Sequence, residues 1–436
     1  MNPEFERNLW LEADPRRLAW TGVAIAALYA AVGLVAHAGT LQALGYAGAV
    51  VFVVAGLVWG SRAAGRAVGD EVGERTWDFQ RLSALTPWAM TWGKLFGATS
   101  LSWVAALTGL VLFVASAAAT RGPGPALQEA VTGLSGAILL QAGSMALALV
   151  GVRRARAEGR NAAFRFTFGG MVGLLVVATA AGRGLRFGGP FQWLMAAAQG
   201  VSWWGVEVPQ GWFVALSLAA FAAWAMVAAW RLMRLELQME NVPWAWPLFV
   251  LFAGLWAAGL AVGAAAAFAA AGAVFAACAY AAAFAEPADP VRLRRFGAAI
   301  ADRVPQTALL AAPAVLAPVA LAAAAVIGIA LVPHEFSAAP SALQALAAFA
   351  FVLRDLGIVA YFRFGPRPGR GDFGAVVGLF LAYLVGGIVG SSLGGETGRA
   401  LFTPSGVAPA VAAVSGAVQA VLVWVLAWGR VQRPAR

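Results

Sequence analysis

Residues 264–285 read AAAAFAAAGAVFAACAYAAAFA, a run without a single charged side chain. An α-helix crosses the bilayer core with about 20 apolar residues, and a run this uniform has no polar face to turn toward water. The run therefore predicts a transmembrane helix. With eleven similar runs it predicts an all-α, polytopic membrane helix bundle of about twelve transmembrane helices, at 18–37, 43–61, 94–119, 127–152, 166–183, 211–231, 244–262, 264–285, 307–332, 342–362, 373–394 and 406–429.

The composition of the whole chain also favours lipid as its solvent. Of the 436 residues, 61% are hydrophobic and 11% are charged, whereas soluble domains carry about 25% charged residues. A water-soluble core of this size could not hide that much apolar surface. The formal net charge is +10, but no basic stretch carries a nucleic-acid-binding signature, so we expect no nucleic-acid partner.

The distribution of arginine and lysine predicts the orientation in the membrane. With the N-terminus placed inside, the segments on that side carry 26 of the 30 basic residues and the opposite segments carry 4. Such an excess is the pattern of cytoplasmic loops. We therefore predict that both termini are cytoplasmic and that the basic loops face anionic membrane lipid. One missed or invented helix would reverse every later loop and remove the excess.

The predicted helices divide evenly along the chain. Six fall in residues 1–240 and six in residues 241–436, which suggests two six-helix halves. In each half the longest loop on the cytoplasmic side follows the second helix, at 62–93 and at 286–306. This correspondence indicates a duplicated unit, although the two loops share little sequence.

Side chains that carry chemistry are scarce in the apolar runs. His37 and His334 are the only histidines, and neither has ligand spacing with the other or with acidic residues, so we expect no metal site. Cys278 lies in an apolar run with nothing beside it to activate a thiolate, which favours a small packed residue. We expect no catalytic residue and no cofactor in this chain.

Arg354 and Asp355 are adjacent charged residues inside the tenth predicted helix. One interpretation is a local charge pair near the inner leaflet, in which Asp355 lowers the cost of a snorkelling Arg354. The other is a gating pair that acts as a polar hinge or contacts a substrate. Adjacent helical residues point about 100° apart, so we expect the two side chains to pair with different neighbours.

Residues 69–94 read GDEVGERTWDFQRLSALTPWAMTWGK and form the longest polar insertion of the first half. The acidic residues at its start suit a helix N-terminus, and apolar residues follow at partly helical spacing. Pro87 after Thr86 is suited to end this helix and to begin the next. Lys94 is expected to snorkel to the cytoplasm. The prediction is a short helix near 70–93 that either binds a cytoplasmic partner or only caps the bundle.

The order of these residues resembles the coupling helix of type-2 ABC transporter (ABC-2) permeases. That pattern runs Glu-x-x-x-Gly-Thr, apolar residues, Thr-Pro, and then Gly-Lys at the next span. Glu71 to Thr76, Thr86-Pro87 and Gly93-Lys94 provide these elements, and Arg75 departs from the pattern where the family usually has glycine. The opening MNPEFERNLWLE is similar to the start of a bacterial subgroup, and the stretch Leu353–Gly357 with Tyr361-Phe362 is similar to its C-terminal half.

The resemblance implies the permease subunit of an ATP-driven ABC-2 exporter in the bacterial cytoplasmic (inner) membrane. The chain has no Gly-x-x-x-x-Gly-Lys-Ser/Thr sequence, so a separate ABC ATPase subunit would bind ATP and Mg²⁺. Loop 286–306 lacks the pattern, and the permease is then either one asymmetric chain or a pair of permease chains. The implied partner-binding residues are Glu71, Glu74, Thr76, Trp77, Phe79, Leu82, Pro87 and Lys94.

Two other functions stay open at this stage. An ion-coupled secondary transporter needs a titratable group at mid-membrane, and apart from Arg354 and Asp355 the predicted helices place none near a centre. A non-transport membrane scaffold, or an enzyme that acts on lipid, would be favoured by a convergent polar site at either leaflet. A neighbouring reading frame for a P-loop ATPase would favour the exporter.

Overall fold

A computed structural model describes residues 2–36, 40–74, 76–81, 83, 85–157, 200–239, 242–332, 340–365, 371–404 and 407–432. The chain separates into two compact units. Unit 1 is built mainly from residues up to Asn241, and unit 2 mainly from Val242–Arg436.

The described residues contain nine helices that are long and apolar enough to cross a membrane, and a bent pair, Pro305–Ala311 with Leu316–Leu331, makes a tenth candidate. The chain is therefore an all-α, multi-pass helix bundle. The count of twelve stays a prediction: the predicted helix 166–183 lies outside the described residues, and the predicted helix 244–262 forms only the short apolar helix Ala245–Ala258.

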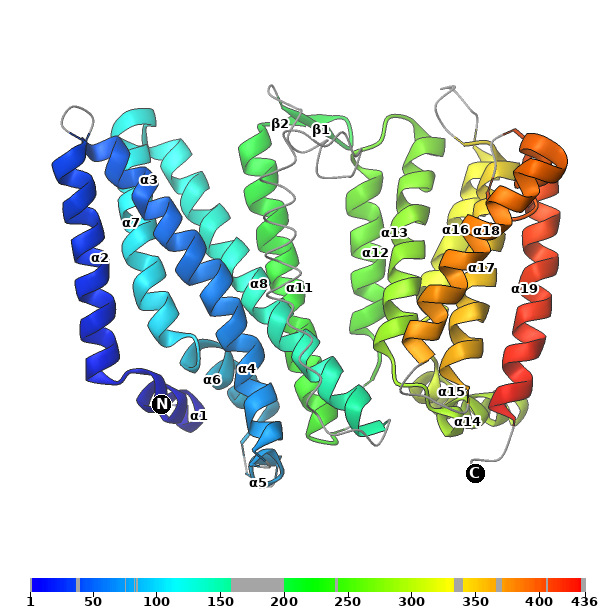
Figure 1. Ribbon diagram of the computed structural model, residues 1–436, viewed down its shortest axis with the longest axis horizontal. Coiled ribbons are helices and arrows are strands. Elements are labelled where there is room, and N and C mark those ends of the chain that lie inside the picture. The colour runs from blue at the N-terminus through cyan, green and yellow to red at the C-terminus, as the bar shows by residue number, and fades with distance from the viewer. Residues whose placement is uncertain are drawn as a thin grey trace. The chain divides into compact units, whose positions relative to one another are not determined.

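Unit 1 contains one long helix built from three segments, because α3, the π-helical η1 and α4 follow one another without a break. α3 packs against α7, and α1 packs against α6. Within this unit α1, α5 and α6 gather at the end where α4 terminates (Figure 1). The elements are α1 (Pro3–Glu12), α2 (Pro15–Val35), α3 (Thr40–Phe52), η1 (Val53–Trp59), α4 (Gly60–Gly73), α5 (Trp77–Arg81), α6 (Pro87–Gly97), α7 (Ser100–Arg121), α8 (Pro123–Ala157) and α11 (Gln210–Glu236).

The third predicted helix begins later than expected. The prediction of a span at 94–119 is wrong at its start, because α6 is a separate helix and the long helix α7 begins at Ser100. The prediction for Thr86-Pro87 is confirmed: the Thr86 side chain accepts a hydrogen bond from the Ala89 amide as N-cap, and Pro87 opens α6. Residues 87–97 thus form a helix of their own that carries Lys94 into the protein.

Unit 2 is a bundle in which α13 packs against α12 and α16, and α17 packs against α18 and α19. The short helices α14 and α15 lie at the end of this unit where α13 and α19 terminate (Figure 1). The elements are α12 (Ala245–Ala258), α13 (Ala264–Ala285), α14 (Pro290–Ala301), α15 (Pro305–Ala311), α16 (Leu316–Leu331), α17 (Ala342–Arg363), α18 (Gly371–Arg399) and α19 (Pro409–Val431). A two-stranded hairpin, β1 (Val201–Trp203) with β2 (Val206–Val208), precedes α11.

The predicted span 307–332 is bent. α15 and α16 meet at 97°, because Pro313 lacks the amide hydrogen of a continuous helix and disfavours helical geometry in the residue before it. Glu286 supports the break: its carboxylate accepts a hydrogen bond from the Ala314 amide at 2.8 Å and pairs with Arg292. Arg292 also donates to the Ala312 carbonyl at 2.7 Å.

The end of α18 folds back on itself. Gly394 and Gly395 have non-helical backbone angles, and Gly395 has φ +57°, a left-handed conformation that glycine adopts without steric cost. The chain then returns along α18, so that Phe402 packs against Gly386 and Gly390. This return carries the Phe402 carbonyl toward α17.

Candidate functional site

Lys94 is the centre of a buried ionic cluster in unit 1. Its side chain is fully buried. The Nζ atom donates to the carboxylate of Glu71, lies 2.7 Å from Glu4 Oε1, and donates to Gln80 Oε1 at 2.6 Å. The expectation that Lys94 snorkels to the cytoplasm is therefore wrong, because two carboxylates and an amide hold the ammonium inside the protein.

Arg7 completes this cluster from the N-terminal helix. Its guanidinium pairs with Glu4 at 2.9 Å and with Glu71. We call Glu4, Arg7, Glu71 and Lys94 the ionic hub. Two carboxylates and two cations cancel in formal charge, which permits the burial of Lys94 and Glu4, while Arg7 closes the cluster from its exposed side. The hub joins α1, at the start of the chain, to α4 and α6, which flank α5.

Glycine lets α1 approach α6 closely. A Cβ atom on Gly93 would lie 2.7 Å from the Glu4 Cβ, and one on Gly97 would lie 2.7 Å from the Asn8 Cβ. The spacing of Gly93 and Gly97 predicts such close packing, and here it brings Glu4 within reach of Lys94. Asn2 fixes the start of α1 by donating to the Ala89 carbonyl at 2.6 Å.

The hub lowers the pKa of Glu4. Burial alone would raise it, but the hydrogen bonds from Arg7 and the positive charge of Lys94 outweigh burial and hold the pKa below its ordinary value near 4.5. The same pairing raises the pKa of Arg7 despite its partial burial, through hydrogen bonds to Glu4 and Glu71. Glu4 and Arg7 are therefore ionised at neutral pH.

Asp70 and Glu71 lie at the C-terminal end of α4, not at the start of the coupling helix as expected. α5 begins only at Trp77 and is five residues long. Acidic residues at a helix C-terminus oppose the helix dipole. Pairing with Arg7 and Lys94 offsets this cost for Glu71.

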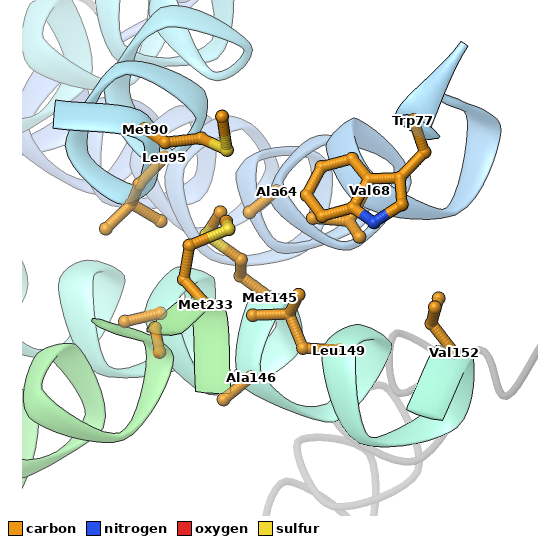
Figure 2. Close-up of a cluster of buried hydrophobic side chains, with 12 residues drawn as sticks. Ala64, Val68, Trp77, Met90, Leu95, Met145, Ala146, Leu149, Val152 and Met233 are labelled. Atoms are coloured by element: carbon orange, nitrogen blue, oxygen red, sulfur yellow. The ribbon is translucent and has the colours of Figure 1, made fainter. Parts of the chain in front are cut away.

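Trp77 is an internal anchor of unit 1. Its side chain is 1% exposed and packs in a buried cluster with residues of α4, α6, α8 and α11 (Figure 2). Lys94 Nζ lies 5.3 Å from the centre of its ring, a cation–π contact. The Trp77 side chain is thus not presented to a partner in this conformation. The cluster consists of Ala64, Val68, Trp77, Met90, Leu95, Ala142, Met145, Ala146, Leu149, Val152, Ala229 and Met233.

The other sequence-predicted site residues divide into exposed and buried positions. Glu74 and Thr76 are exposed in the turn between α4 and α5, where the Thr76 amide and hydroxyl donate to the Glu71 carbonyl at 3.0 and 3.2 Å. Pro87 is buried at the start of α6. The side chains of Phe79 and Leu82 lie outside the described residues.

A second buried ionic cluster lies in unit 2. Arg354 and Asp355 are 1% and 2% exposed in the middle of α17. Their side chains pair with each other, with Arg354 Nη2 2.7 Å from Asp355 Oδ1, so the charge pair of the first interpretation is present. Each side chain also has further partners of its own, as the expectation of different neighbours requires. Asp355 Oδ2 also accepts hydrogen bonds from Tyr280 and Tyr383, both at 2.7 Å.

Arg354 connects this cluster to the returning chain after α18. Its Nη1 donates to the Phe402 carbonyl at 3.0 Å and to Gln419 Oε1 at 3.3 Å. The guanidinium carbon also lies 4.5 Å from the Phe351 ring centre and 4.6 Å from that of Tyr383. These bonds connect α13, α17, α18 and α19 through one charge pair.

Sequence reasoning missed several members of both clusters. Glu4, Arg7 and Gln80 were not singled out, although Glu4 and Asn8 share a face of an amphipathic helix that could have indicated docking. In unit 2 the missed residues are Tyr280, Tyr383 and Gln419. Each is a polar residue inside an apolar run, and such residues usually face a polar partner within the bundle, so this pattern could have indicated them.

Within the described ranges, no group of three histidine, cysteine or acidic residues is arranged to hold a metal ion. His37 and His334 both lie outside those ranges. Comparisons with protein-family models, with curated proteins and with solved structures gave no match for this chain.

Removing Lys94 should destabilise unit 1 strongly. Lys94→Met leaves the carboxylates of Glu4 and Glu71 without a buried counter-charge, which costs about 3–5 kcal/mol. The double variant Glu71→Gln/Lys94→Met should recover part of this loss. The measurement is the temperature at which the detergent-purified protein loses its monodisperse elution peak.

The matched control for this prediction is Arg17→Ala. Arg17 pairs with Glu12 at 3.7 Å on the surface, where such a pair contributes little. If Lys94→Met lowers the transition no more than Arg17→Ala, the hub does not stabilise the fold.

The docking of α1 should depend on pH through Glu4. Because the folded-state pKa is below the unfolded value, the stabilisation is fully present above about 4.5 and is lost as the pH falls through the lowered pKa. Hydrogen exchange of residues 3–12, corrected for intrinsic rates from neutral pH down to about 3, measures this loss. Glu4→Gln should flatten the dependence, and Glu6→Gln should keep it. If hydrogen exchange in Glu4→Gln keeps the same pH dependence, groups other than Glu4 cause it.

Proposed function

We propose that this chain is the membrane-spanning permease subunit of an ABC-2 type exporter, and that a separate ATPase binds the segment around α5. One observation supports this most. Glu71 and Lys94, which belong to the coupling-helix pattern and are 23 positions apart, form a direct, largely buried pair that joins the end of α4 to α6. A partner that moves this segment would therefore move α4 and α6 together.

The charges suit a basic partner. Glu74 is exposed, whereas Glu71 is already paired within the chain. We therefore assign the electrostatic contact to Glu74 and give Glu71 an internal role. Trp77 supports the segment from beneath, so that a push on α5 is transmitted into the buried cluster around Met90 and Met145.

The proposed consequence is a rigid-body transfer of force. α4 continues through η1 and α3 to Thr40 as one helix of 34 residues. A displacement at Glu74 would therefore reach the far end of this helix without a hinge of loop residues. The bound ATP and Mg²⁺ would belong to the partner subunit, and the transported substrate is left unassigned.

An ion-coupled carrier is the second candidate, because Asp355 is an acidic residue in the middle of α17. Its carboxylate is already paired with Arg354 and accepts hydrogen bonds from two tyrosine hydroxyls. A coupling ion would have to displace these partners. Uptake driven by a proton or sodium gradient, in vesicles that contain this chain and no ATPase, would favour the carrier over the exporter.

The exporter proposal is tested by binding to the P-loop ATPase encoded in a neighbouring reading frame. The full-length chain in nanodiscs should bind that ATPase, and Glu74→Lys should weaken binding several-fold by charge reversal. Glu207→Lys is the matched control, because Glu207 is exposed in β2, before α11. Equal affinity of the wild type and Glu74→Lys, or the lack of such an ATPase, would contradict the proposal.

Trp77→Ala is a poor test of the same contact. Trp77 is buried, and truncation of a buried tryptophan costs about 3–5 kcal/mol of stability. A loss of ATPase binding in that variant would report the cavity and not a lost surface contact.

A further inference from the structure

A shallow groove lies between α14 and the end of α19 in unit 2. It has a volume of about 450 Å³ and is lined by Arg294, Gly297, Ala298, Trp428 and Gln432. The three α14 residues are spaced i, i+3 and i+4, so they share one face of that helix. The space beside Gly297 is open, because a Cβ atom there would meet no atom within 4 Å.

The polar side chains of the groove are hydrogen-bond donors. Arg294 is exposed and its Nε donates to the Pro290 carbonyl at 3.3 Å. Among the described residues it forms no ion pair, and none of the lining residues is acidic. The guanidinium, the Gln432 amide and the Trp428 indole each carry N–H donors, and all three residues line the same groove. This donor set suits a phosphate group.

An apolar face continues from the groove along α19. Val425 and Val421 lie one and two turns before Trp428 on the same face, and they are 65% and 64% exposed. α19 is long and apolar enough to cross a membrane, so an exposed apolar face on it is suited to lipid tails. A phosphate at the groove would therefore sit at the head of a chain-shaped apolar surface. Tryptophan is also typical of the depth where headgroups and tails meet.

We propose that this groove binds the headgroup phosphate of an anionic phospholipid, whose acyl chains lie along Val425 and Val421. The occupant is anionic because no acidic residue lines the groove to pair with a choline or ethanolamine group. Such lipids are enriched on the side of the membrane to which the arginine-rich loops are predicted to belong. This site is independent of the ATPase proposal.

The neighbouring arginines serve as internal comparisons. Arg292 is engaged by Glu286 and by the Ala312 carbonyl. Arg295 is exposed like Arg294 but does not line the groove. A site-specific lipid must therefore distinguish Arg294 from Arg295, whereas a general attraction between a basic surface and an acidic membrane cannot.

The test is native mass spectrometry of the full-length protein titrated with phosphatidylglycerol or with phosphatidylcholine. We expect phosphatidylglycerol to be retained about tenfold better. Arg294→Ala should remove that preference, Gly297→Leu should remove it by filling the groove with the charge unchanged, and Arg295→Ala should keep it. An elution profile like that of the wild type establishes that each variant is folded.

Two outcomes would overturn the proposal. Equal retention of the two lipids, or equal loss in Arg294→Ala and Arg295→Ala, would mean that the groove selects no lipid. Displacement of phosphatidylglycerol by inorganic phosphate at equal concentration would mean that the site binds a free anion and that the acyl chains contribute nothing.

Discussion

The buried pairing of Glu71 with Lys94 determines how one end of unit 1 is built. The negative end of the α4 dipole would repel Glu71 if this residue stood alone. Lys94 from α6 and Arg7 from α1 compensate the carboxylate, and each can do so only if its own helix docks. The docking of α1 and α6 against the end of α4 thus compensates the charge of one acidic residue. Glycines at 93 and 97 then allow the close approach that the pairing requires.

Unit 2 meets a related problem with different residues. Glu286 directly follows the end of α13, and Glu71 lies at the end of α4. Like Glu71, Glu286 bonds to residues of the short helices and turns that follow, here Arg292 and Ala314. The surroundings differ in charge: the first corner exposes Glu74, and the second exposes Arg294 and Arg295. If the two halves descend from one unit, the acidic residue at the end of the helix (Glu71 or Glu286) has been kept, and the charge of the exposed residues around it has changed. These outer surfaces match the two proposals, an anionic lipid at Arg294 and a basic partner at Glu74.

The sequence predicted the helical, membrane-embedded class because lipid imposes a pattern that single residues reveal. It also predicted the helix start at Thr86-Pro87, since capping is local chemistry. It did not predict that Lys94 and Trp77 are buried, because their burial depends on Glu4, Gln80 and Met145, which lie elsewhere in the chain. For Arg354 and Asp355 the sequence offered the charge pair, but it did not reveal the other groups that hold these side chains. Those groups are the Phe402 carbonyl of the returning chain and the hydroxyls of two distant tyrosines.

The proposed coupling role requires that the segment after α4 faces the cytoplasm and that a bound ATPase covers it. Ser83 is exposed in this segment, and Cys278 is the only cysteine of the chain, so Ser83→Cys in a Cys278→Ser background provides a single reactive thiol. The account predicts that a membrane-impermeant maleimide labels this thiol in inside-out vesicles and that the bound ATPase protects it. Labelling only from the opposite face, or equal labelling with and without a bound ATPase, would contradict it.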